Sequence, residues 1–406
     1  MLLGKLTTRN IFYLMKKKLL LFILLPLFSM AQKETLWRLE IPSPGGAIPV
    51  HLLLSDDGRA FAINADEKLE FDRVFTVKDT LHLRLELYDL ELILAIKNGK
   101  LNGLMNKRGA DMLYRQVPFT GTANDPARFK NTRAAQPLAP KYQVTFKNES
   151  SGKESPAIGV FQVDNGKVKG SFLTNTGDYR YLQGNVAGDS LYLSALGSSA
   201  VMYKARIKGD SLTGGTSYTP FGKGSGFSGV KNESYELPDA TKLTFLKEGQ
   251  ERFDFTFKDI NGRDVSLSDP RFKGKVTVVQ ILGTWCPNCL DETRFLTEYK
   301  KENPLLEVIG LAFERNSEPS FAWPKIGRFI ERFGVDYPVL LAGTIQEAGE
   351  KLPQLNHVMA FPTSIIVDKK GQVRKIHTGF TGPGTGSYYD QYVKEFAAFV
   401  KELQAE

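Results

Sequence analysis

Cysteine is scarce in this chain. Only Cys286 and Cys289 occur among the 406 residues, and they lie three positions apart. A small secreted protein that is stabilised by disulfides contains many more cysteines, so this chain is not a disulfide scaffold. Its stability must come from hydrophobic cores, and a chain of this length with 42% hydrophobic residues can form more than one of them. The two cysteines are therefore interpreted as a chemical group rather than a structural one.

Clusters of metal ligands and of basic residues are also lacking. The four histidines stand singly along the sequence, without the spacing that a zinc site needs beside two cysteines: His51, His82, His357 and His377. The net charge is +8, but the lysines and arginines are scattered, and no basic stripe alternates with aromatic residues. We therefore expect no metal, no other cofactor and no nucleic acid as a partner.

Long apolar runs are missing except near the N-terminus. There, three lysines at residues 16–18 precede an apolar stretch at residues 19–28, and Ala31 occupies a position that signal peptidases prefer. This pattern predicts a signal peptide at residues 1–31, with Met15 as the true start of the protein. An uncleaved membrane tether is the alternative, because the apolar stretch approaches the length of a membrane span. In both cases we expect the rest of the chain to be exported.

The sequence from residue 32 to residue 240 predicts an all-β, antiparallel domain of the barrel or sandwich type. Residues 81–87 alternate between leucine and polar side chains, as in a strand with one buried face. Asn98 and Gly99 are typical of a hairpin turn, and similar turn signals recur at short intervals. A segment with three prolines at residues 121–141 predicts an exposed linker. We favour one barrel-like unit over two separate β-units on either side of this linker.

Residues 245–406 show a different pattern, in which apolar strands alternate with helices. The stretch at residues 275–282 is predominantly apolar, as expected for a strand that is buried on both faces. Periodicity predicts helices at residues 289–300, 325–333 and 388–403, and further strands at residues 306–313, 363–367 and 373–378. This order predicts a single α/β domain.

The two cysteines lie where the first of these strands turns into the first helix. At a helix N-terminus, free N–H groups and the helix dipole favour a negative charge. Cys286 is therefore expected to be the attacking thiolate, and Cys289, one turn further on, the buried resolving thiol. Pro287 suits the first helical position because it has no N–H group to leave unpaired. The pattern predicts a redox-active dithiol that exchanges disulfides with a substrate.

Three features of the sequence together resemble a known family. They are the segment at residues 283–289, the acidic Glu292 three residues after the second cysteine, and the segment at residues 361–368 followed by Gly371. On these features, residues 250–406 resemble the thioredoxin superfamily, and specifically the exported TlpA/ResA-like thiol-disulfide oxidoreductases. Similar β-rich regions precede such domains in exported proteins of the Bacteroidetes type.

The resemblance implies roles for residues other than the cysteines. Pro362 is implied to be a cis-proline beside the dithiol, where it shapes the surface that holds an extended substrate. Glu292 is implied to influence the protonation of the thiols, although it could equally be a solvated residue on the helix face. Thioredoxin itself carries a buried aspartate at the position of Gln280, and glutamine cannot titrate. Glu292 or water would then have to take the proton of Cys289.

Four further residues are expected to line a substrate groove, because they flank the dithiol and the proline in the sequence. These residues are Trp285, Pro287, Phe361 and Thr363.

The expected function is that of a periplasmic thiol-disulfide oxidoreductase, acting as a reductant rather than an oxidant. Its partners would be protein dithiols and disulfides, with a membrane-borne electron donor and a part in cytochrome c maturation left open. A thiol peroxidase is one alternative, but the Pro-X-X-X-Thr-X-X-Cys pattern of that family is missing before Cys286. The other alternative is that the β-rich domain binds a ligand or partner and the dithiol domain is accessory to it.

Overall fold

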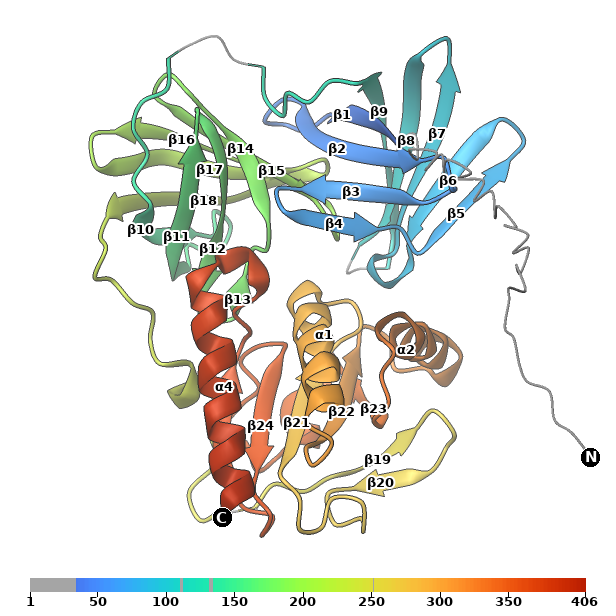
Figure 1. The fold of residues 1–406 in the computed structure, drawn as a ribbon, viewed down its shortest axis with the longest axis vertical. Coiled ribbons are helices and arrows are strands. Elements are labelled where there is room, and N and C mark those ends of the chain that lie inside the picture. Colours follow the sequence, from blue (N-terminus) through green and yellow to red (C-terminus); the bar gives the residue numbers. More distant parts are fainter. Residues whose placement is uncertain (1–33, 110–111, 131–133, 251) are drawn as a thin grey trace, which may run out of the picture.

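The computed structural model describes residues 34–109, 112–130, 134–250 and 252–406. Within these ranges the chain forms three sheets, and the first two are entirely antiparallel. Figure 1 shows these two β-sheets side by side on one side of an α/β unit. The predicted signal peptide at residues 1–31 lies outside the described residues. In the part of the chain that the structure describes, no helix is both long and apolar enough to cross a membrane.

The first sheet contains nine strands, and its first strand in sequence pairs with its last. The alternation of buried and partly exposed residues along β7 reflects one face packed on the core. The predicted turn at Asn98 and Gly99 is confirmed, because both have positive φ values and join β7 to β8. In spatial order the strands are β4 (Glu67–Glu70), β3 (Ala60–Asn64), β2 (Ile48–Ser55), β1 (Glu34–Ile41), β9 (Tyr114–Ala123), β8 (Lys100–Arg108), β7 (Leu90–Lys97), β6 (Thr80–Leu85) and β5 (Arg73–Val77).

The second sheet closes into a barrel. Its strand β11 pairs both with β10 and with β12, so that eight strands form a ring and the short β13 extends from β12. Its interior is filled by aromatic side chains, among them Phe146, Phe172 and Phe227, whose rings lie 5.2 to 5.5 Å apart. In spatial order the strands are β11 (Glu154–Asp164), β10 (Lys141–Lys147), β18 (Gly222–Lys231), β17 (Ser211–Thr219), β16 (Ala200–Lys208), β15 (Ser190–Leu196), β14 (Leu182–Ala187), β12 (Lys167–Thr174) and β13 (Gly177–Asp178).

The predicted all-β, antiparallel character of this part of the chain is confirmed, but the preference for one barrel-like unit is wrong. The two sheets share no strand. Strand β9 returns to pair with β1, with Trp37 opposite Ala123, and so completes the first sheet before the linker begins. Hairpin patterns reveal which neighbouring strands pair, whereas this long-range pairing decides where one sheet ends.

The connection between the two sheets runs from residue 124 to residue 140, slightly shorter than the predicted linker at residues 121–141. It is not exposed throughout. Arg128 is 3% exposed and donates a hydrogen bond of 3.0 Å to the carbonyl of Ile63, and its own carbonyl accepts one of 3.2 Å from Arg38. The linker is therefore fastened to the first sheet at Arg128.

The third sheet belongs to the α/β unit, and its central strands β21 and β22 are buried along their whole length. Strands β21, β22 and β23 are parallel, and the others are antiparallel to their neighbours. The strand β23 was not predicted. In spatial order the strands are β20 (Asp264–Ser266), β19 (Thr256–Asp259), β23 (Val339–Thr344), β22 (Glu307–Glu314), β21 (Thr277–Leu282), β24 (Thr363–Val367) and β25 (Val373–Thr378).

Four α-helices accompany this sheet within the described ranges: α1 (Pro287–Glu302), α2 (Pro319–Phe333), α3 (Ala348–Lys351) and α4 (Ser387–Ala405). Helix α2 begins earlier than residue 325, because Pro319 occupies its first turn and Pro324 is tolerated inside it. The N-terminal end of α1 faces the two β-sheets (Figure 1).

The first sheet and the α/β unit share one buried hydrophobic cluster. Leu87 and Tyr88, in the 3₁₀ turn that follows β6, belong to the same cluster as Cys286, Leu290 and Phe329. The dithiol therefore lies beside a core that is built from more than one sheet.

Candidate active site

The dithiol is positioned by the end of strand β21 and the start of helix α1. The N–H of Cys286 donates a hydrogen bond of 3.0 Å to the carbonyl of Gly283, which closes the turn between the two elements. Cys286 caps the helix: its sulfur accepts a hydrogen bond of 3.3 Å from the backbone N–H of Cys289. Both cysteines are present as thiols. The Sγ of Cys286 therefore lies where the helix N-terminus favours negative charge.

The peptide bond between Phe361 and Pro362 is cis, as the resemblance implied. It lies directly beside the dithiol, because the thiol of Cys286 donates a hydrogen bond of 3.2 Å to the carbonyl of Phe361. The hydroxyl of Thr363 donates one of 2.9 Å to the carbonyl of Ala360 and so braces this turn.

Cys289 is completely buried inside the first turn of α1. Burial raises its pKa well above that of an ordinary thiol, and the hydrogen bond and charge of Cys286 add to this effect. A thiol in this position is protected from solvent, and the sulfur of Cys286 lies next to it, 3.3 Å from its backbone N–H.

Glu292 is also completely buried, so it is not a solvated residue on the helix face. Its carboxyl group accepts hydrogen bonds of 2.9 Å from the amide of Gln280 and of 2.9 Å from the hydroxyl of Ser364. Burial raises the pKa of Glu292 to about 7, although both hydrogen bonds act in the opposite direction. The amide of Gln280 also donates a hydrogen bond of 3.3 Å to the carbonyl of Cys289. Gln280 therefore connects the resolving cysteine to a carboxyl group that titrates near neutral pH.

The predicted groove residues lie on two sides of Cys286. The indole of Trp285 donates a hydrogen bond of 3.0 Å to the carbonyl of Phe313, and its ring centre lies 5.9 Å from that of Phe361. Pro287 begins α1 on the other side, and its carbonyl accepts a hydrogen bond of 3.1 Å from Arg180. Thr363, the fourth of these residues, is completely buried.

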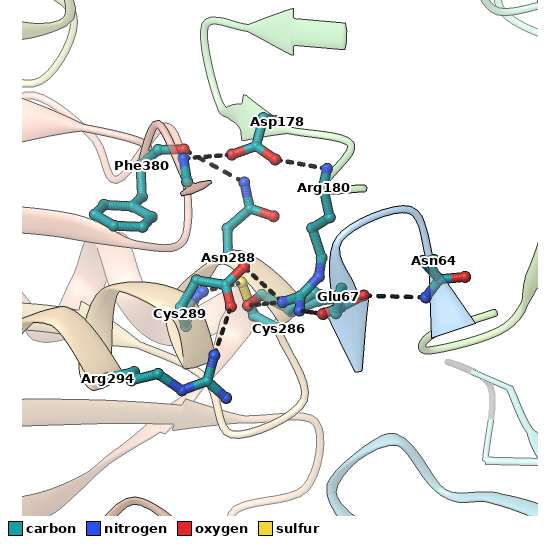
Figure 2. Close-up of polar contacts among 12 residues, drawn as sticks. Asn64, Glu67, Asp178, Arg180, Cys286, Asn288, Cys289, Arg294 and Phe380 are labelled. Carbon is teal, nitrogen blue, oxygen red and sulfur yellow. Dashed lines mark hydrogen bonds and ion pairs between the residues drawn. The ribbon is translucent and has the colours of Figure 1, made fainter. Parts of the chain in front are cut away.

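Sequence reasoning missed the residues that the β-sheets bring to the dithiol. Figure 2 shows Arg180 of the barrel reaching down between Glu67, in strand β4 of the first sheet, and helix α1. Its guanidinium forms an ion pair of 2.6 Å with Asp291, which is buried in α1 beside Glu292. Burial raises the pKa of Asp291, and Arg180 counteracts this effect. No local sequence pattern predicts these contacts, because Arg180 and Pro287 are 107 residues apart.

No group of three or more potential metal ligands gathers anywhere in the described ranges. The groups that the structure brings together at this site are the two thiols, the carboxyl group of Glu292 and the hydrogen-bond donors of Gln280 and Ser364.

Comparison with known proteins identifies the family to which the α/β unit is related. A family model described as Redoxin matches residues 247–393. The thiol-disulfide oxidoreductase ResA of Geobacillus kaustophilus is 28% identical over 143 residues, which are 34% of this chain and 74% of that protein. ResA of Bacillus thuringiensis strain Al Hakam is 30% identical over 132 residues, which are 32% of this chain and 68% of that protein. The chain belongs to the ResA-like thiol-disulfide oxidoreductases.

Among solved structures, a secreted thiol-disulfide isomerase from Corynebacterium glutamicum is 18% identical and covers 42% of this chain and 98% of its own, with a TM-score of 0.31. The Redoxin match lies within the α/β unit. This oxidoreductase therefore carries two β-sheets that the family match does not include.

Proposed function

We propose that this oxidoreductase exchanges disulfides through Cys286 and Cys289, and that it acts as a reductant outside the cytosol. The observation that carries the proposal is the position of the Cys286 sulfur. It lies at the N-terminus of α1, 3.3 Å from the N–H of Cys289 and 3.2 Å from the carbonyl of Phe361. The helix N-terminus stabilises the thiolate that must attack, and the chain beside Pro362 offers a backbone surface for the substrate.

The reaction proceeds in two exchange steps. The thiolate of Cys286 attacks one sulfur of the substrate disulfide, which forms a mixed disulfide and releases the other substrate sulfur as a thiolate that takes up a proton. Cys289 then loses its proton and attacks the Cys286 sulfur of the mixed disulfide. The substrate leaves as a dithiol and Cys286 and Cys289 form a disulfide, so that two electrons and two protons pass to the substrate.

In this proposal Glu292 accepts the proton that Cys289 loses. In the second step a buried thiol with a raised pKa has to ionise, and this requires a nearby base. With a pKa of about 7, the carboxyl group of Glu292 is ionised in about half of the molecules at neutral pH, and its charge is felt at Cys289. Gln280 fixes the carboxylate through its hydrogen bond of 2.9 Å and does not itself titrate.

The raised pKa of Cys289 supports the reducing direction. A dithiol becomes a strong oxidant when its reduced form is stabilised as a thiolate. Burial disfavours a thiolate at Cys289, whereas the helix N-terminus favours one at Cys286, and the reducing direction requires the first effect to outweigh the second. Equilibration with glutathione buffers is expected to give a reduction potential near that of thioredoxin, roughly −270 mV, rather than the roughly −120 mV of a strong oxidant.

The proposed compartment and partners follow from the N-terminal sequence and the family. Three lysines and an apolar stretch within residues 1–31 support export to the periplasm, with residues 32–240 and 245–406 remaining as the β-rich and dithiol parts. The proposed substrates are protein dithiols and disulfides, and the reductant would be regenerated by a membrane-borne donor. Cell fractionation of the full-length protein tests the location, and recovery in the cytosol contradicts it.

Two substitutions test the dithiol. Cys286→Ser is expected to abolish reduction of a disulfide substrate, because serine cannot form the mixed disulfide. Cys289→Ser is expected to accumulate mixed disulfides, because the resolving thiol is missing. These appear as additional bands on a non-reducing gel and disappear when the sample is first treated with dithiothreitol. The double variant, which lacks both sulfurs, is the matched control and should trap nothing.

The same preparations separate this proposal from its alternatives. Consumption of hydrogen peroxide faster than reduction of a disulfide would identify a thiol peroxidase instead. If Cys289→Ser traps no partner while the β-rich part binds one, the redox unit is accessory to binding.

A further inference from the structure

The β12–β14 loop of the barrel, defined as residues 175–181 and including β13, is packed against the dithiol turn. A Cβ atom on Gly177, whose φ is +131°, would lie 2.1 Å from the side-chain nitrogen of Asn288 between the two cysteines. A Cβ atom on Gly379, in the loop after β25, would lie 2.9 Å from the backbone of Thr176. Backbones approach this closely only where side chains are absent. The loop therefore packs closely against the α/β unit, with no room for a side chain at either glycine.

Arg180 fastens this loop to the first sheet and to helix α1 of the α/β unit. Its guanidinium pairs with Asp291 at 2.6 Å, donates to the carbonyl of Pro287 at 3.1 Å and pairs with Glu67 (Figure 2). The exposed fractions of these side chains are small: 14% for Arg180, 11% for Glu67 and 5% for Asp291. Paired charges this far out of solvent have a defined geometry and are costly to separate.

Asp178 holds the same loop from the other side. Its carboxylate accepts hydrogen bonds from the N–H of Arg180 at 2.5 Å and from the N–H of Gly382 at 2.6 Å. Arg180 itself has a φ of +56°, an unusual conformation for a residue other than glycine, and the first of these hydrogen bonds stabilises it.

The first sheet closes the remaining side. Lys325 of α2 forms an ion pair of 2.7 Å with Asp89, and Arg332 donates a hydrogen bond of 3.2 Å to the carbonyl of Glu70. Tyr88, next to Asp89, is buried in the same cluster as Cys286. Cys286 is only 5% exposed, although it is the thiol that has to meet the substrate.

A small cavity borders this enclosure. Its volume is about 320 Å³, and it is lined by residues of all three sheets' units, including Tyr88, Arg180, Tyr181, Pro287 and Asn288. Its size suits a small molecule or a single extended segment of a polypeptide. Neither cysteine is among its lining residues, so restricted access to Cys286 is argued from the 5% exposure of that residue and from the close packing of the loop on the dithiol turn.

We propose that the β12–β14 loop, held by Arg180, is a specificity element that admits disulfides on slender, flexible chains to Cys286 and excludes those on folded proteins. This inference rests on the proposed exchange at Cys286. Arg180 is a positioning residue: it holds the loop and the start of α1 without taking part in the exchange of sulfurs. Loosening the loop should therefore widen access and leave the reactivity of the thiol itself almost unchanged.

The test compares two substrates on the full chain. One is a fluorescent mixed disulfide of glutathione, and the other is folded insulin, with the reduction rate of each measured for the wild type, Arg180→Gln and Gly177→Ala. Each variant is expected to raise the rate of insulin reduction by about tenfold and to change the rate of reduction of the glutathione disulfide by less than about twofold. The reason is that each variant weakens the packing of the loop on the dithiol turn and so raises the fraction of molecules in which the loop has moved away from it. Arg206→Gln is the control: it removes an exposed ion pair with Asp189 on the same barrel and should change neither rate.

The outcomes separate the two proposals. If the wild type does not reduce the glutathione disulfide, the exchange chemistry at Cys286 is wrong. If it does, and both loop variants leave the ratio of the two rates unchanged or lower both rates together, the loop is merely structural and this inference is overturned.

A measurement on the unsubstituted protein covers the case in which the variants do not fold. After reduction, the rate at which Cys286 reacts is measured with iodoacetamide and with a polymer-linked iodoacetamide, and each rate is divided by the rate of free glutathione with the same reagent. The relative rate with the polymer-linked reagent should be at least about tenfold lower than the relative rate with iodoacetamide. Equal relative rates for the small and the large reagent would refute the specificity element.

Discussion

Replacing Glu292 by glutamine removes a buried acid without changing the shape of the side chain. Glu292 is 0% exposed, and burial raises its pKa from an ordinary 4.5 to about 7. The folded state therefore binds the proton more tightly than the unfolded chain. Any stability that depends on this proton is complete below pH 4.5 and is lost as the pH rises through 7.

The magnitude follows from the size of the shift. Raising the pKa of Glu292 from 4.5 to about 7 corresponds to about 3 kcal/mol in the free energy of unfolding. Glutamine does not titrate, so Glu292→Gln should lack this loss. It has only one acceptor oxygen for the two donors, Gln280 and Ser364, which costs about 1 to 3 kcal/mol at every pH. The effect of Glu292→Gln on the free energy of unfolding therefore has a part that depends on pH and a part that does not, and measurements at two pH values separate them.

The assay is urea unfolding of the reduced protein at pH 4.5 and at pH 7.5. The difference between wild type and Glu292→Gln should change by about 3 kcal/mol between these pH values, in favour of the variant at the higher pH. Glu298→Gln, at an exposed position on the same helix, is the matched control and should follow the wild type. Parallel pH dependences for wild type and Glu292→Gln would refute the reasoning.

The same variant tests the proton acceptor. If Glu292 takes the proton of Cys289, Glu292→Gln should slow the release of substrate from the mixed disulfide by about 10²-fold at pH 7.5, a typical effect of general base catalysis. The pH profile of this step should also lose its rise near 7. An unchanged profile would leave water as the acceptor.

Two further substitutions test buried polar contacts, one between units and one inside the α/β unit. Lys325→Met should lower the free energy of unfolding by about 3 to 5 kcal/mol, because Asp89, with only 16% of its side chain exposed, loses its partner at 2.7 Å; a loss below about 1 kcal/mol in urea unfolding would show that the pair contributes little. Thr284→Val should cost about 1 to 3 kcal/mol, because the buried carboxyl group of Glu314 keeps only the backbone donor of residue 284 and loses the hydroxyl at 2.9 Å. An unchanged thermal midpoint would contradict this second expectation.

Local sequence patterns predicted the parts of the site that lie close together along the chain. The turn from β21 into α1 depends on neighbouring residues, so Cys286 and Pro287 were placed correctly at the helix start. The hairpin at Asn98 and Gly99 was predictable for the same reason, since a two-residue turn needs positive φ values. The cis bond before Pro362 was implied by the family resemblance rather than by the residues alone.

Burial of charged residues could not be read from the same patterns. Helix α1 carries Asp291, Glu292 and Thr293 in succession, which resembles a solvated face, yet all three are buried. Arg180 covers Asp291 from another sheet, and Gln280 and Ser364 cover Glu292 from adjacent strands. A residue's polarity indicates that it needs a partner but does not show whether that partner is water.

The sequence by itself determined the dithiol, the helix that follows it and most of the strands and helices of the α/β unit, because backbone conformation and hydrophobic periodicity act over a few residues. Only the tertiary structure decided that the β-rich part forms two sheets, and that Arg180 and Glu67, 113 residues apart, meet at the start of α1. Strand pairing and ion pairing at such separations depend on how whole sheets pack, and this packing also determines how little of Cys286 is exposed.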